Sequence, residues 1–293
     1  MFSVPVILGA LEAGCIYALV ALALLLSYRV LNIADMTTDG SFTLGCAVSA
    51  TVALTGHPWL ALPAAMLAGA AAGAVTSLLQ TRLKIPSILA GIITNTALYT
   101  VNLAVMGFSS NVSLLKTDTI FTILRPYLGA GYKLIPAAVI TLVMGMLLVV
   151  FLKTRLGLSI RATGDNPEMV RASSINTAFT VTVGLCIANA LTALSGAVLA
   201  QYQRTADINL GTGMVVIGLA SLIIGQTLIP GAKPWVQALG AVLGSILYRF
   251  FIALALWLDL PSECLKLISA TIVALAIGLP ALKKGGKRHA AVK

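Results

Sequence analysis

Long apolar stretches follow one another along this chain, and short polar segments separate them. The pattern predicts membrane-spanning helices at 4–28, 40–56, 60–80, 86–107, 133–152, 176–201, 212–230, 235–257 and 264–282. Most of these stretches are close to the roughly 20 apolar residues that a helix needs to cross a bilayer. The chain is therefore predicted to be all-α and polytopic, with about 8–9 transmembrane helices. The odd count leaves open that one short segment is re-entrant.

Composition supports this interpretation. Of the 293 residues, 59% are hydrophobic and only 10% are charged, which is too apolar for a soluble domain. The formal net charge of +10 comes mostly from basic residues at the ends of apolar stretches. It therefore indicates orientation in a lipid membrane and not nucleic-acid binding. The cysteines show no close spacing and are predicted to be packing residues: Cys15, Cys46, Cys186 and Cys264.

The basic residues predict one orientation. The tail 283–293 is the densest basic cluster, so the C-terminus is expected in the cytoplasm. Counting spans back from the tail places the loop 153–175 in the cytoplasm as well, and the segment 108–132 outside. The whole chain, 1–293, is predicted to form one transmembrane domain that includes this loop and this tail.

The loop 157–175 is the longest charged stretch in an otherwise apolar chain. Asn166 followed by Pro167 is typical of a helix start, because Asn caps helices and Pro is tolerated at the first position. Glu168 then falls in the first turn, where the helix dipole favours an anion. The pattern predicts a short helix outside the membrane that is available to another protein. A solvated connection between two spans is the alternative.

Two parts of the chain share a pattern of Gly, Pro and Asp residues. The matching segments lie 172 to 176 residues apart, and they are 34–40 with 206–213, 58–59 with 234–235, and 85–87 with 260–262. Their common order predicts an inverted internal repeat, in which the first Asp-Gly segment faces the cytoplasm and the second faces outside. Many transporters place the solute path between such halves. Two similar hairpins without functional symmetry are the alternative.

Several polar residues fall inside the apolar stretches, where they are costly and usually face a bundle interior or water. Glu12 and Arg249 are candidates to pair with each other or to meet a charged substrate. An interface position for Glu12 and a snorkelling side chain for Arg249 are the alternatives. Asn95, Asn102 and Asn189 are expected to form interhelical hydrogen bonds or, less directly suggested by the sequence, to contact a ligand.

Three aspartates precede predicted helices, and each is expected to cap backbone N–H groups or to form part of a gate. They are Asp35, Asp39 and Asp207. The candidate residues for a translocation pathway or gate are Glu12, Asn32, Asp35, Asp39, Asn95, Asp207 and Arg249.

Enzymatic function is not indicated. The chain has no phosphate-binding loop of the Gly-x-x-x-x-Gly-Lys-Ser/Thr type. His57 and His289 are isolated, so neither a metal site nor a Cys-His pair is predicted. A transport protein without a cofactor of its own is the prediction.

The loop resembles the cytoplasmic loop of permease subunits in ABC importers of the branched-chain amino acid and ribose type. The resemblance rests on Gly157, Arg161-Ala162, Gly164, Asn166-Pro167 and Ile175, and also on 31–35 and the Asp-Gly-Ser-Phe segment 39–42. Ser174 stands where the family commonly has Gly. The segment 39–42 is most similar to the tryptophan/tyrosine-type subgroup.

The resemblance implies that the loop is a coupling helix that docks on a separate cytoplasmic ATPase, which binds ATP and Mg. The residues implied at this contact, or supporting it, are Arg161, Asp165, Asn166, Pro167, Glu168 and Arg171.

The resemblance further implies a homodimeric permease in a bacterial cytoplasmic (inner) membrane. An extracytoplasmic substrate-binding protein would deliver a small solute, such as an aromatic or other amino acid, for import. The competing hypothesis is an ion-coupled secondary transporter that uses Glu12 and the membrane-edge aspartates.

Overall fold

The computed structural model describes residues 4–257 together with Leu267 and Thr271. The tail 283–293 lies outside the described residues, as does almost all of the predicted span 264–282. The long helices are α1 (Val4–Leu24), α3 (Pro58–Thr81), α4 (Ser87–Val105), α6 (Leu134–Lys153), α9 (Thr177–Gln203) and α11 (Pro234–Trp257). The shorter helices are α2 (Thr38–Leu54), α5 (Ile120–Leu128), α7 (Arg155–Asp165), α8 (Pro167–Ala172) and α10 (Met214–Leu228).

Short non-α elements complete the fold. A π-helical turn, η1 (Leu25–Val30), ends the first helix, and a 3-10 turn, η2 (Gly129–Gly131), follows α5. Strands β1 (Asn111–Ser113) and β2 (Thr205–Asp207) pair antiparallel, with Val112 opposite Ala206. The all-α prediction therefore holds for the helical body, and the strands add one small ladder.

Six of the described helices are long and apolar enough to cross a membrane: α1 with its π turn, α3, α4, α6, α9 and α11. The predicted spans 40–56 and 212–230 instead become α2, with 17 residues, and α10, with 15 residues. At 1.5 Å per residue these helices are about 25 and 23 Å long, less than the ~30 Å of a hydrocarbon core. Helix α2 is as long as the predicted span, whereas α10 is shorter because 212–213 and 229–230 are not helical.

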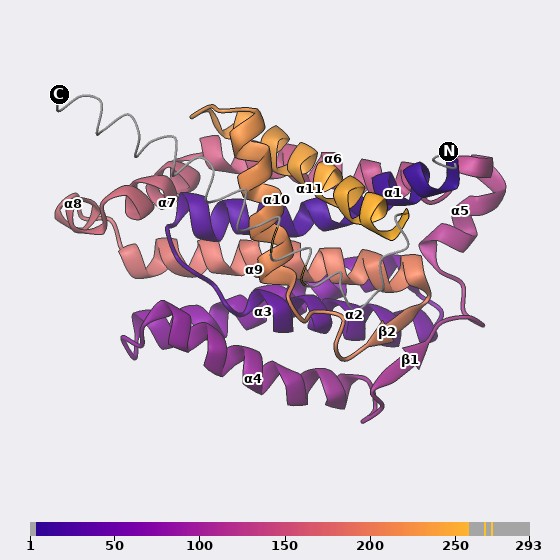
Figure 1. Cartoon of the computed structure of the whole chain (residues 1–293). Coiled ribbons are helices and arrows are strands. Elements are labelled where there is room, and N and C mark those ends of the chain that lie inside the picture. The colour runs from indigo at the N-terminus through magenta and orange to yellow at the C-terminus, as the bar shows by residue number, and fades with distance from the viewer. Residues whose placement is uncertain (1–3, 258–266, 268–270, 272–293) are drawn as a thin grey trace.

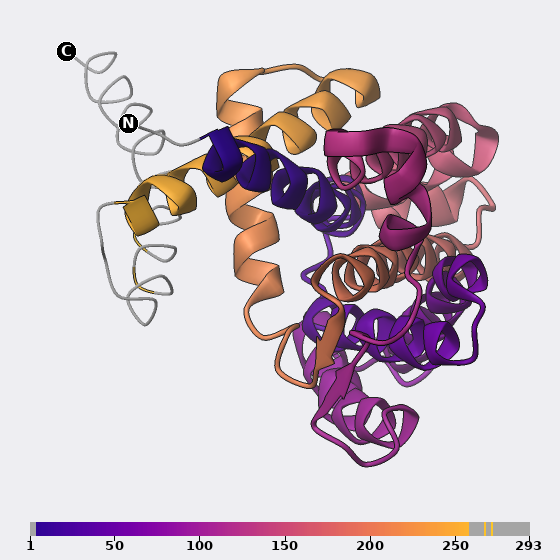
Figure 2. The same ribbon diagram turned by 90° about the vertical axis from the view of Figure 1, so that its right-hand side faces the viewer.

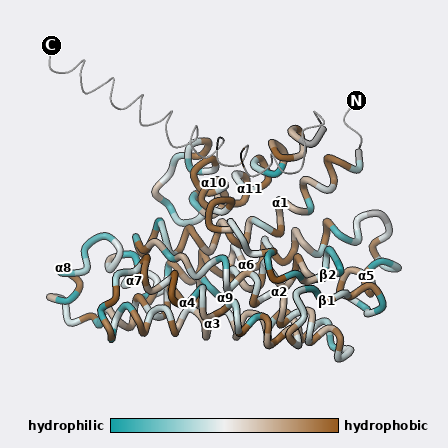
Figure 3. Tube along the Cα trace, turned by 60° about the horizontal axis from the view of Figure 1, so that its bottom comes forward, coloured by the Kyte–Doolittle hydropathy of each residue, from teal (hydrophilic) through white to brown (hydrophobic). Residues whose placement is uncertain are grey.

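The long helices α1, α3, α4 and α9 run alongside one another, and α10 crosses them at a steep angle (Figures 1 and 2). Helices α7 and α8 lie at one end of the molecule, and α5 with the β1–β2 ladder lies at the other (Figure 1). Hydrophilic residues gather at both of these ends (Figure 3). This arrangement agrees with the predicted placement of 153–175 and 108–132 on opposite sides.

Helix α9 is the centre of the core. Within its most apolar stretch 83% of the residues are buried, against 28% in α6. Helix α3 approaches it closely, since a Cβ added to Gly69 would lie 2.4 Å from the carbonyl oxygen of Asn189. A Cβ at Gly244 of α11 would lie 2.0 Å from the carbonyl oxygen of Ser221 in α10. These glycines therefore allow the helix backbones to approach closely.

Candidate functional site

The predicted surface helix is present as α8, and its start is built as the sequence indicates. Asn166 Oδ1 accepts hydrogen bonds from the backbone N–H groups of Glu168 (3.1 Å) and Met169 (3.0 Å). Pro167 is the first helical residue, and its missing N–H costs nothing there. Val170 points inward and is 1% exposed, whereas the other residues from Pro167 to Ala172 are exposed. Helix α8 therefore presents its polar side to the exterior.

The six residues implied at the ATPase contact lie together at this end of the molecule. Arg171 Nε donates to Thr177 Oγ1 over 3.1 Å and ties α8 to the first turn of α9. Asp165 is exposed and Arg161 is half-buried on α7. Ser174 has a φ of +61°, a left-handed conformation that favours glycine. Glycine would adopt this conformation without strain.

Helix α7 rests directly on the end of the first span. A Cβ added to Gly164 would lie 1.9 Å from the carbonyl oxygen of Val30, so only glycine allows this contact. Thr163 Oγ1 also shares a 2.9 Å hydrogen bond with Thr180 Oγ1 of α9. The surface loop is therefore connected to both long helices that lead into the core.

A buried polar network lies along the connection 31–37 between η1 and α2. Asp35 is 3% exposed, and its carboxylate accepts from the N–H of Thr37 (2.9 Å) and from Asn189 Nδ2 (2.7 Å). Asn189 Oδ1 in turn accepts from Ser41 Oγ over 2.6 Å. The interhelical hydrogen bonds predicted for Asn189 are confirmed. The network fixes the start of α2 against the middle of α9.

The first turns of α2 and α10 meet at the Asp39 carboxylate. Asp39 Oδ2 accepts from the N–H of Gly213 and Oδ1 from the N–H of Val215, each over 2.9 Å. Thr43 Oγ1 accepts from the N–H of Gly211 over 3.1 Å. A carboxylate stabilises a helix N-terminus because it faces the positive end of the dipole. The prediction that the two Asp-Gly segments lie at opposite faces is therefore wrong, since the short helices bring them together.

A polar pocket of about 210 Å³ lies beside this junction, between α2, α4 and the segment 208–212. Asn102, on α4, is 1% exposed, and its Nδ2 donates to the carbonyl oxygen of Gly40 over 3.2 Å. Its Oδ1 is buried without a partner. The polar side chains that line the pocket belong to Asp39, Thr43, Asn95, Thr96, Tyr99, Asn102, Asn209 and Thr212.

Of the predicted pathway residues, only Asp39 and Asn95 line this pocket. Sequence reasoning missed the other polar lining residues, which are Thr43, Thr96, Tyr99, Asn209 and Thr212. An indication was available for Asn209 and Thr212, since both fall within the repeat segment that matches 34–40.

Glu12 and Arg249 do not pair with each other. Glu12 Oε2 accepts from the hydroxyl of Tyr202 over 2.8 Å. The Arg249 guanidinium carbon lies 3.5 Å from the centroid of the Tyr17 ring, a cation–π contact. Of the alternatives given for Glu12 and Arg249, pairing is therefore not the one found, since each side chain contacts a tyrosine instead.

The remaining predicted residues lie outside the pocket. Asn32 is exposed, with a φ of +56°, where the chain turns after η1. Asp207 belongs to β2, and its Oδ1 accepts from the N–H of Asn209 over 2.8 Å. Both residues therefore shape turns that lead into the short helices.

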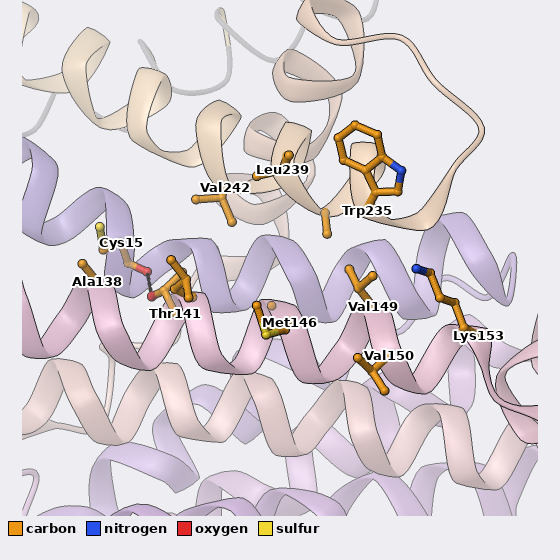
Figure 4. Close-up of a pocket in the computed structure, with 13 residues that line it drawn as sticks. Cys15, Ala138, Thr141, Met146, Val149, Val150, Lys153, Trp235, Leu239 and Val242 are labelled. Atoms are coloured by element: carbon orange, nitrogen blue, oxygen red, sulfur yellow. Dashed lines mark hydrogen bonds between the residues drawn. The ribbon is translucent and has the colours of Figure 1, made fainter.

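A larger hollow of about 610 Å³ lies between α1, α6 and α11 (Figure 4). Its lining is apolar apart from Thr141 and Lys153. Thr141 Oγ1 donates to the Cys15 carbonyl oxygen over 2.7 Å, and Lys153 lies at one end, near Trp235 (Figure 4). This hollow, called the apolar groove below, offers few groups that could orient a polar solute. Within the described ranges no cluster of three His, Cys, Asp or Glu residues is placed to hold a metal ion.

Comparison with known proteins assigns the chain to a family. The model of the branched-chain amino acid transport system permease component matches residues 6–283. The chain belongs to this family. It is a multi-pass permease subunit of an ABC importer in the inner membrane. The permease itself is not catalytic, because a separate ATPase binds ATP and a substrate-binding protein delivers the solute.

Three relatives illustrate the family. A tyrosine transport system permease protein of Clostridioides difficile (strain R20291) is 35% identical over 268 residues, which is 91% of this chain and 88% of the relative. The ribose import permease protein RbsC of Haemophilus influenzae is 22% identical, over 94% of this chain and 85% of the relative. The inner membrane ABC transporter permease protein YjfF of Escherichia coli K12 is 26% identical, over 82% and 78%. No solved structure matches the chain.

Proposed function

We propose that this permease imports an aromatic amino acid of the tyrosine type, as a homodimer whose ATPase docks on the loop 157–175. The substrate class is supported by the 35% identity to a tyrosine transport permease and by the sequence of segment 39–42. The docking surface is supported by one structural observation above others, the capped and outward-facing helix α8.

Helix α8 exposes charged and apolar side chains that a partner protein can contact. Glu168 and Arg171 carry opposite charges on an exposed helix, and the apolar side chain of Met169 is 57% exposed between them. Arg161 and Asp165 support the loop from α7. A short amphipathic helix of this kind fits a groove on a partner, with the charged residues fixing its register.

The contacts behind α8 suggest how ATPase movement reaches the solute path. Helix α7 is in van der Waals contact with the carbonyl of Val30 at Gly164. The chain then continues through 31–37 to Asp35 and Asp39, and Asp39 bonds to the start of α10. Displacement of α7 would therefore move the junction between the two short helices. Coupling requires that the two arrangements of this junction differ in affinity for ATP or solute.

We further infer that the whole chain is one permease domain with an inverted repeat and a cytoplasmic C-terminus. The repeat is supported by α2 and α10, which are both short and both follow a non-helical connection. We place the solute path on the two-fold axis of the homodimer, with the repeat shaping each wall. An even number of copies of this chain in the purified transporter is the expected result.

The experiment that tests the docking surface is co-purification of the ATPase with variants of the full permease. The double substitution Glu168→Ala and Arg171→Ala should reduce recovered ATPase at least about tenfold, since charged contacts at an interface cost 1–3 kcal/mol or more when truncated. Ser173→Ala is the matched control, because this exposed hydroxyl bonds only to the Met169 carbonyl within the same turn. Undiminished ATPase recovery and uptake in the double variant would contradict the proposal.

The ion-coupled hypothesis makes a different prediction for the isolated chain. Tyrosine uptake into proteoliposomes that contain only this permease should be absent under a proton or sodium gradient. Uptake should require the ATPase, ATP and the binding protein together. Gradient-driven uptake by the permease alone would favour a carrier that uses Glu12.

A further inference from the structure

We propose that the polar pocket between α2, α4 and 208–212 binds the ammonium group of a zwitterionic amino acid on its way through the permease. This inference rests on the proposed function, since it specifies the chemistry of the imported solute. It places the recognition of that solute at a junction that also links the two short helices.

The buried amide of Asn102 is the observation that carries the inference. The side chain is 1% exposed, and its Nδ2 is oriented by the hydrogen bond to the Gly40 carbonyl oxygen. The Oδ1 atom therefore has a defined position, and it lacks a hydrogen-bond donor. A buried acceptor without a donor is destabilising, because it has lost its hydrogen bond to water. A ligand that brings a donor to this atom recovers that free energy.

The charges of the residues that line the pocket favour a ligand whose hydrogen-bond donor is positively charged. Asp39 is the one ionisable carboxylate among the residues around the pocket, and no Lys, Arg or His lines it. Each Asp39 oxygen already accepts one backbone N–H, and each has a further lone pair. A primary ammonium has three donors, which matches a pocket lined by both Asn102 and Asp39. The pocket thus favours a cation and disfavours a lone carboxylate.

The rest of the pocket suits the other parts of an amino acid. Asn209 and Thr212 are exposed at the mouth and supply amide and hydroxyl donors for a carboxylate. Tyr99, which is 55% exposed, offers a ring face on which an aromatic side chain can stack. The volume of about 210 Å³ is several times the ~30 Å³ share of one water molecule, which allows one small solute.

The test compares two substitutions on the same helix in the complete transporter. Asn102→Leu removes the free acceptor at similar size, whereas Thr94→Val removes a buried hydroxyl that bonds only within α4, to the Ala90 carbonyl. ATP-driven tyrosine uptake should fall at least about tenfold in Asn102→Leu, because a hydrogen bond to a charged group is worth ~1.5–3 kcal/mol. Thr94→Val should remain within about twofold of the wild type.

Ligand specificity gives a readout that a packing defect does not reproduce. Excess tyramine, which keeps the ammonium, should protect Thr212→Cys in the purified transporter from a maleimide, whereas 4-hydroxyphenylpropionate, which lacks it, should not. Ser173→Cys on α8 should be labelled equally with either compound. Equal protection by both compounds would overturn the inference, because binding would then not depend on the ammonium group. Protection by neither compound would also overturn it and would indicate a pocket that holds water alone.

The outcomes also separate this inference from the proposed function. If Asn102→Leu keeps both ATPase association and normal tyrosine uptake, the pocket inference fails and the proposed function stands. If the wild-type transporter with its ATPase imports no aromatic amino acid, the proposed function fails first. Retained ATPase association with lost uptake in Asn102→Leu alone is the result expected here.

Discussion

Two of the hollows in this molecule, the apolar groove and the polar pocket, differ in the side chains that line them. The apolar groove between α1, α6 and α11 is nearly three times as large, at about 610 Å³ against 210 Å³, but none of the described residues that line it has a buried polar atom without a hydrogen-bond partner. The polar pocket is small, yet it is lined by Asp39 and by Asn102, whose buried Oδ1 has no hydrogen-bond partner. Volume alone would therefore direct attention to the wrong hollow. Specific recognition depends on a few oriented polar groups within an otherwise apolar frame.

The largest effect expected from this comparison comes from placing a charge in each hollow. Met146, near the middle of α6, is 63% exposed in the apolar groove, so Met146→Asp should cost about 2.5–3.5 kcal/mol in membrane insertion. Thr212→Asp, at the polar pocket, should insert normally and reduce uptake instead. Glycosylation-tag insertion assays and uptake measurements check both. Equal insertion of the two variants would remove the distinction.

A smaller effect is expected from adding one methyl group to a glycine in each region. A Cβ at Gly211 would lie 2.0 Å from the Asp39 carbonyl oxygen, so Gly211→Ala should force α2 and α10 apart. We expect a loss of about 1–3 kcal/mol in stability and at least a tenfold loss of uptake. Gly145→Ala is the control, because its Cβ meets only Leu22 at 3.5 Å. Thermal unfolding in detergent measures the stability change, and similar melting of both variants would argue against a tight junction.

Removing the Asp39 carboxylate at the junction should lower the stability of the protein more than removing the Lys153 ammonium at the end of the apolar groove. Asp39→Ala removes the acceptor for two backbone N–H groups of α10 and should cost about 1–2 kcal/mol in stability. Asp39→Asn keeps an acceptor oxygen and should lose less. Lys153→Ala, an exposed position at the end of the groove, should melt like the wild type. A lower melting temperature for Lys153→Ala than for Asp39→Ala would reverse the ranking.

The smallest expected effect comes from a substitution at Ser174, which should change stability without changing uptake. Ser174→Gly should relieve the strain of the left-handed backbone, which stabilises the folded state by about 1–2 kcal/mol. Glycine also makes the unfolded chain more flexible, which favours the unfolded state by about 0.4–1 kcal/mol. The net gain of about 0.5 kcal/mol should raise the melting temperature by about 1–2 °C. Uptake should not change, which would show that uptake losses at the polar pocket are not a general response to stability. A lower melting temperature would mean that Ser174 does not carry this strain.

Local features of the fold could be predicted from the sequence, and distant ones could not. The start of α8 depends on Asn166 and the two backbone N–H groups that follow shortly after it, so the residue order alone was sufficient. The bonds from Gly213 and Val215 to Asp39 span more than 170 residues. The apolar pattern showed that 40–56 is short, but it gave no sign that α2 and α10 meet at their first turns. The role of Asn102 was predicted only in part, because no pattern in the sequence shows that its Oδ1 lacks a donor.

The β1–β2 ladder has a consequence for cargo delivery. Residues 111–113 belong to the segment predicted outside, and residues 205–207 lead directly into the segment before α10. Backbone bonds extend this pairing on both sides, from Leu114 to Arg204 and from Ile208 to Ser110. A binding protein that displaces the segment 108–132 would also displace β2 through this pairing. Strand β2 leads into α10, whose first turn is hydrogen-bonded to Asp39. Docking of the loaded binding protein outside and movement of the ATPase inside would then both displace helix α10.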